Sequence, residues 1–196
     1  MDPLTLLNGA YENTARIVAK VTADQLHAPT PCREWDVQAL LNHTTGVIGR
    51  FVATADRTPA AKPGDTPARD ALAQQDWIGD DPAAAYDKNT RANLDAWSRA
   101  GALEGTCVLP GGFELPAQVA AGINFIDALV HGWDLAKAIH VDATLDPDLA
   151  SAALEISRMV IKDDFRGPGN GFGYQVLVPD GASLTDQLVG LLGRQP

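Results

Sequence analysis

The sequence predicts an all-α protein, built as a bundle of four long helices with short extra helices and an irregular C-terminal extension. Three observations favour this class. Apolar residues recur every three to four positions through several long segments. Runs typical of β-strands are few and short, and no internal repeat is visible. Loops of varied length separate the helical segments, as expected for helices packed around a common core.

The N-terminal half predicts two helices. The first is expected at residues 4–22, where the apolar residues share one face: Leu4, Leu7, Tyr11, Ala15, Val18 and Val21. A connection with two prolines, ADQLHAPTPCREW, follows it. Asp36 is placed as an N-cap, and Trp35 before it and Leu40 after it form a hydrophobic staple. The second helix is therefore expected at residues 37–55.

Proline, glycine and periodicity predict the other elements. A loop is expected at 56–68, and the glycine-rich stretch 163–183 is expected to be irregular. The segment TCVLPGGFELP (106–116) fits either a small β-hairpin or a loop. Further helices are expected at about 69–78, 82–100, 116–140, 146–162 and 184–193.

Length and composition restrict the class of protein. A chain of 196 residues fits one domain, spanning residues 1–196. Its formal charge of −10 and pI of about 4.6 argue against nucleic acid and anionic membranes as partners. The N-terminus lacks the pattern of a secretory signal, and no apolar run is long enough for a membrane span. Two distant cysteines without metal-ligand spacing fit free thiols in the cytoplasm.

The helix expected at 116–140 carries a polar stripe beside its apolar face. Asn124, Asp127, His131 and Asp134 follow one another by three, four and three residues, so they share one face. The spacing of Asp127 and His131 allows both side chains to reach one ion. A solvated helix face is the alternative interpretation. The surrounding apolar residues favour the ion, because burying an unpaired carboxylate is costly.

His43 is the candidate partner of this pair. It lies on the core side of the second helix, and facing helices would bring it to Asp127 and His131. Two imidazoles and one carboxylate leave coordination positions open for water or substrate, as catalytic metal sites do. A hydrogen-bonded core histidine without a metal is the alternative. Asp134 is expected either to orient the His131 ring or to be a plain surface carboxylate.

Other polar residues are interpreted without a catalytic role. Cys32 is expected to be a buried thiol, since no activating base lies near it in the sequence. His27 and His140 are interpreted as surface residues. The glycines of GPGNGFG do not form a phosphate loop, because the segment lacks the GK[ST] ending and follows no strand.

Three blocks resemble a known family: TPCREWDVQALLNHTTG, DALVHGWDLAKAI and GFGYQVLVPDGASLTDQLVGLLGRQP. Together they resemble the actinobacterial DinB-like metal-binding proteins, which are similar to the N-terminal domain of mycothiol-dependent maleylpyruvate isomerase. The resemblance implies an up-and-down four-helix bundle that holds a divalent metal. It places the ligands at His43, Asp127 and His131, although the isomerase has Glu at the position of Asp127.

The resemblance also implies hypotheses about function. The first is a metal-dependent S-transferase, with zinc or a similar divalent ion, that joins a thiol such as mycothiol to a small electrophilic substrate. Isomerisation itself is not expected, because the chain is too short for the isomerase's further C-terminal domain. The alternative is a non-catalytic bundle that binds a metal or ligand as a sensor or assembly module. The resemblance also implies a homodimer, because DinB-like bundles often pair.

Overall fold

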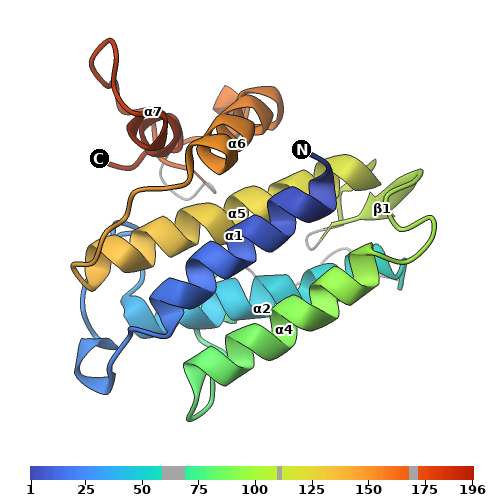
Figure 1. Cartoon of the computed structure of the whole chain (residues 1–196), viewed down its shortest axis with the longest axis horizontal. Coiled ribbons are helices and arrows are strands. Elements are labelled where there is room, and N and C mark those ends of the chain that lie inside the picture. Colours follow the sequence, from blue (N-terminus) through green and yellow to red (C-terminus); the bar gives the residue numbers. More distant parts are fainter. Residues whose placement is uncertain (59–68, 110–111, 168–171) are drawn as a thin grey trace.

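A computed structural model describes residues 1–58, 69–109, 112–167 and 172–196, and its main body is a bundle of four long helices (Figure 1). The helices are α1 (Pro3–Val18), α2 (Val37–Ala55), α4 (Pro82–Trp97) and α5 (Ala117–Ala138). α1 packs against α4 and α5, and α2 packs against the same two helices. The predicted all-α, DinB-like bundle is thus confirmed.

The four helices form two parallel pairs, α1 with α5 and α2 with α4, and the two pairs run in opposite directions (Figure 1). In the α1–α5 contact, Tyr11 donates to Asn124 and Thr14 donates to the carbonyl of Ala128, so the residue numbers increase together along both helices. α2 and α4 run the other way (Figure 1). Because α2 and α5 touch, the second helix of the chain faces the last helix of the bundle.

Most long helices begin where the sequence gives a start signal. Asp36 caps α2 as predicted, since its carboxylate accepts from the backbone N–H of Ala39 at 2.9 Å. Asp81 caps α4 in the same way, with Pro82 in the first turn. The helix ends differ more: α1 stops at Val18 rather than at residue 22, and α4 stops at Trp97 rather than at residue 100. Helix ends depend on tertiary contacts that a local pattern does not contain.

Shorter elements surround the bundle. The segment 106–116, for which a hairpin and a loop were both open, forms antiparallel strands β1 (Thr106–Val108) and β2 (Glu114–Pro116). α3 (Arg69–Ala73) is shorter than the helix expected at 69–78. Two 3₁₀ helices span Ala23–Gln25 and Asp163–Phe165. The predicted loop at 56–68 and the centre of GPGNGFG lie mostly outside the described residues.

The C-terminal extension lies on the α1–α5 side of the bundle (Figure 1). It contains α6 (Pro147–Val160) and α7 (Leu184–Leu191), which pack against each other. α6 also packs on α5 and α1. With α1, α2 and α6 around it, α5 is covered on nearly every side, which explains why its sequence is apolar almost all round.

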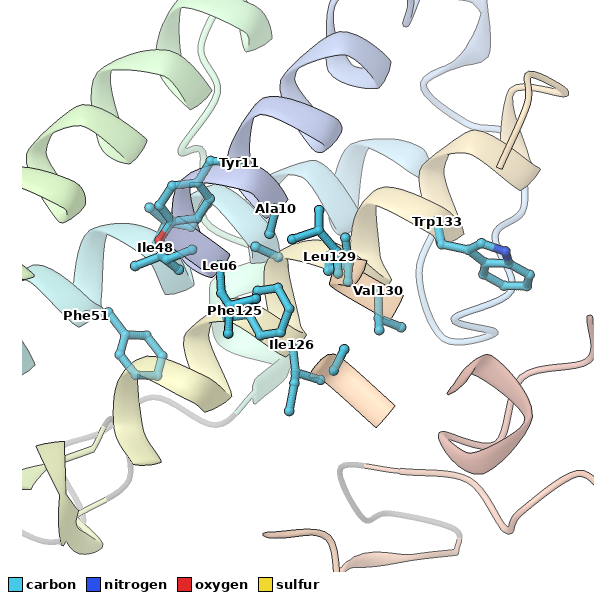
Figure 2. Close-up of a cluster of buried hydrophobic side chains, with 14 of the residues drawn as sticks. Leu6, Ala10, Tyr11, Ile48, Phe51, Phe125, Ile126, Leu129, Val130 and Trp133 are labelled. Atoms are coloured by element: carbon cyan, nitrogen blue, oxygen red, sulfur yellow. The ribbon is translucent and has the colours of Figure 1, made fainter. Parts of the chain in front are cut away.

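The core fills the space between these helices. In Figure 2, Phe125, Leu129 and Val130 of α5 lie beside Leu6 and Ala10 of α1. No helix in the described part of the chain combines the length and apolar character that a membrane span requires.

Candidate metal centre

Two residues of the polar stripe on α5, Asp127 and His131, lie beside His43 of α2. The ligand atoms of His43, Asp127 and His131 all lie within 4.8 Å of one another. Both imidazole side chains are 6% exposed, and the Asp127 side chain is 24% exposed. The structure therefore brings together the three residues that the sequence proposed as ligands, at a place that is enclosed except beside the carboxylate.

The spacing of these atoms fits an ion better than direct hydrogen bonds. Asp127 Oδ1 lies 3.5 Å from His131 Nε2 and 3.8 Å from His43 Nε2. Hydrogen bonds between such groups are about 2.7–3.2 Å long. Two ligand atoms at about 2.1 Å from one tetrahedral ion lie roughly 3.4 Å apart. The other carboxylate oxygen, Oδ2, is buried and has no hydrogen-bond partner among the described residues.

Electrostatics keep Asp127 ionised. Burial alone would raise its pKa, but the imidazoles of His131 and His43 outweigh burial and hold the pKa of the Asp127 carboxyl well below its usual value. Burial likewise disfavours a charged His131, whereas Asp127 and Asp134 raise the pKa of this imidazole above its usual value. Asp127 therefore stays charged beside the two imidazoles, and its negative charge could also compensate a bound cation.

Asp134 orients His131. Its carboxylate is fully buried, and Oδ2 lies 3.0 Å from His131 Nδ1. Burial would raise the pKa of Asp134, but Arg194 and His131 lower it, so the carboxylate is ionised and can only accept a hydrogen bond. His131 Nδ1 must then carry a proton, so that in the neutral imidazole the lone pair lies on Nε2, facing Asp127. Of the two interpretations of Asp134, the surface carboxylate was wrong.

Trp35 covers the histidines. Its ring centroid lies 4.2 Å from that of His43, at an interplanar angle of 33°, and 6.1 Å from that of His131. The residue is 6% exposed. Trp35 is thus both the buried neighbour of the Asp36 cap and a wall of the candidate centre.

A second segment fixes the helix around His43. The backbone N–H of Trp77, which follows α3, donates to Asn42 Oδ1 at 2.8 Å. The indole of Trp77 lies so close to Gly46 that a Cβ there would be 2.7 Å from its Nε1. Asn42 and Gly46, on either side of His43 in the sequence, thus both contact Trp77. Glycine is required at position 46 because a larger side chain would collide with the indole.

The sequence missed two residues near the centre. Arg194 donates to Asp134 through Nε at 3.1 Å and through Nη2 at 2.7 Å. Cys32, expected to be buried, is half-buried, and its sulfur forms a close group with atoms of His131 and Asp134. Only a fold could reveal these contacts, because the partners are far apart in the sequence. His27 and His140 are exposed, as expected.

Comparison with known proteins agrees with this fold. A sequence profile of the family described as mycothiol maleylpyruvate isomerase N-terminal domain matches residues 7–136. An uncharacterized protein of Mycobacterium tuberculosis, found in strains H37Rv and CDC 1551, is 36% identical over 99% of this chain and 98% of its own length.

Two solved structures are similar in fold. A crystal structure of a His-to-Ala mutant of the mycothiol-dependent maleylpyruvate isomerase superposes with a TM-score of 0.66 at 15% identity, over 87% of this chain and 72% of that chain. Another crystal structure of that isomerase gives a TM-score of 0.57 at 16% identity with the same coverage. At 15% and 16% identity, these superpositions show that the fold is similar and nothing further.

Proposed function

Because the chain belongs to the family of the mycothiol maleylpyruvate isomerase N-terminal domain, we propose that it is a metal-dependent S-transferase acting on a small electrophile with a thiol such as mycothiol. The observation that carries the proposal is the convergence of His43, Asp127 and His131 from two helices, with their ligand atoms within 4.8 Å of one another. The donor set of two imidazoles and one carboxylate suits zinc in a site with an open coordination position.

The residues of the chain have distinct roles in this proposal. His43 and His131 offer their Nε2 atoms to the ion, and Asp127 offers an oxygen and a negative charge. Asp134 holds the His131 ring through Nδ1, which lies 3.0 Å from its carboxylate. The ring of Trp35 covers His43 and limits the access of water on that side. Access for ligands is left on the side of Asp127, whose side chain is the most exposed of the three.

A divalent ion bound at this place would lower the pKa of a coordinated thiol, so that the reactive thiolate is available near neutral pH. In the transfer, the thiolate sulfur forms a bond to an electrophilic carbon of the substrate. The electron pair displaced from that carbon takes up a proton or leaves with a leaving group. The chain's own contribution is to hold the ion in a fixed geometry beside a partly open face.

Thiol consumption tests the catalytic part of the proposal. Purified protein loaded with zinc is mixed with mycothiol and a panel of small electrophiles, and free thiol is followed over time. The expected result is consumption that depends on both zinc and enzyme and that falls in His43→Ala. The matched control is His140→Ala, which alters an exposed histidine at the end of α5 and should keep full activity. Zinc binding without any thiol turnover would refute the transferase and favour the non-catalytic module.

A further inference from the structure

Arg194 makes a buried ion pair with the carboxylate that holds His131. It lies after α7, 60 residues from Asp134, and donates two hydrogen bonds to it, at 3.1 Å from Nε and 2.7 Å from Nη2. Asp134 is fully buried and Arg194 is 9% exposed. Two parallel bonds of this kind fix the plane of the carboxylate as well as its charge.

The same carboxylate serves His131. Asp134 Oδ2 accepts from Arg194 Nη2 and from His131 Nδ1, which lies 3.0 Å away. A buried carboxylate that loses its guanidinium partner is costly, and without the two bonds from Arg194 the plane of the Asp134 carboxylate is no longer fixed. A carboxylate free to turn would also leave the His131 ring free to rotate. The arrangement of His131 therefore depends on Arg194.

The backbone conformation at the end of α7 positions Arg194 beside Asp134. The helix closes with a Schellman motif: Gly193 donates to Gly190 O at 3.0 Å, and the backbone N–H of Arg194 donates to Val189 O at 2.9 Å. Gly193 has a φ of 83°, in the left-handed region that favours glycine. A Cβ at Gly193 would also lie 2.6 Å from the Cα of Gly173. The direction in which Arg194 leaves α7 is thus set by helix closure and by a contact between two glycines.

We propose that Arg194 is a positioning residue of the candidate metal centre, through which the C-terminal extension completes that centre. Arg194 holds Asp134, Asp134 holds His131, and His131 then presents Nε2 toward Asp127 and His43. The inference rests on the proposed function, since it assumes that these three residues bind the metal. By reciprocity, metal binding should also stabilise the docking of the segment that carries Arg194.

Zinc affinity of matched variants tests this inference. We expect Arg194→Gln to bind zinc about 10–100-fold more weakly than the wild type in competition with a chromophoric chelator, as for other groups that orient metal ligands. The matched control is Arg158→Gln. Arg158 is an exposed arginine on α6, in the same C-terminal extension but outside the contacts that hold Arg194. Its variant should keep the affinity of the wild type.

A double variant separates positioning from folding. Asp134→Asn combined with Arg194→Gln replaces the ion pair by two neutral amides and avoids a lone buried charge. If Arg194 acts through Asp134, the double variant should bind zinc no more weakly than Asp134→Asn alone, so the two effects are not additive. Fully additive losses would overturn the inference, as would wild-type affinity in a folded Arg194→Gln variant.

Two spectroscopic readouts go beyond stability. Zinc should slow hydrogen exchange at the amides of α7 in the wild type, and this slowing should disappear in Arg194→Gln. In metal-free protein, at a pH high enough to make the His131 ring neutral, its ¹⁵N signals should report a proton on Nδ1 in the wild type and a mixture of tautomers in Arg194→Gln. If the wild type binds no zinc, the proposed function fails, and the ring signals alone decide the role of Arg194. Identical ring signals in both proteins would refute it.

Discussion

Replacing Gly132 by alanine should loosen the contact between α1 and α5 beside the candidate centre. Gly132 follows His131 on α5 and faces Thr14 of α1. A Cβ at position 132 would collide with Thr14 Oγ1 and lie 3.1 Å from Thr14 Cβ. Thr14 is fully buried, and its hydroxyl donates to Ala128 O at 2.9 Å. A β-branched side chain has few rotamers in a helix, so Thr14 cannot move aside without losing that hydrogen bond.

The structure gives the size of the effect. Alanine is favoured over glycine within a helix by about 1 kcal/mol. The hydrogen bond lost by Thr14 costs about 1 kcal/mol, which offsets this gain. Overpacking of a close helix contact costs about 1–3 kcal/mol. The net expectation for Gly132→Ala is therefore a free energy of unfolding lower by roughly 1–3 kcal/mol.

Urea denaturation measures this loss as a lower midpoint with an unchanged slope. The matched control is Gly122→Ala on the same helix, where a Cβ would meet the Cγ2 methyl group of Ile156 at 3.3 Å. Its stability should stay within about 1 kcal/mol of the wild type. In a Thr14→Ala background, Gly132→Ala should cost clearly less, because the colliding oxygen is gone. A Gly132→Ala protein as stable as the wild type would refute the reasoning.

Three further predictions follow from the described contacts. Asp36→Ala removes the cap of α2 and should lower stability by about 1 kcal/mol in urea denaturation; an unchanged midpoint would contradict the cap. Trp35→Ala removes the ring over His43 and should lower the free energy of unfolding by about 3–5 kcal/mol, whereas Trp35→Phe should lower it by less than half of that. Equal losses in the two variants would argue against ring packing. Burial raises the pKa of the Cys107 thiol, which lowers its thiolate fraction at any given pH. In timed alkylation followed by mass spectrometry, Cys107 should therefore react more slowly than the half-buried Cys32 in folded protein and equally fast after unfolding. Faster modification of Cys107 in folded protein would contradict its burial.

The bundle and the three candidate ligands followed from local patterns. Helical spacing identified the segments of α2 and α5, and the steps of four and three between Asp127, His131 and Asp134 placed these side chains on one face. His43 could be added because its register on α2 faces the core. These are properties of single helices, which periodicity reports well.

Contacts between distant segments could not be predicted in this way. The sequence left the role of Asp134 open, because the group that decides it, Arg194, lies 60 residues further on, beyond α6, a 3₁₀ helix and α7. Cys32 was judged by its sequence neighbours, whereas the residues near its sulfur come from α5. No periodic signal marks such pairs, so they emerge only when the chain is folded.

Metal content is the most direct test of the central claim, that His43, Asp127 and His131 hold a divalent ion. Protein purified without chelators, or reconstituted with zinc, is analysed for metals beside His43→Ala, His131→Ala and the surface control His27→Ala. We expect a single divalent ion per chain in the wild type and in His27→Ala, with release of the ion as acid protonates the imidazoles. Both core variants should lose it. Full occupancy in His43→Ala and His131→Ala, or no bound metal in the wild type even with added zinc, would contradict the claim.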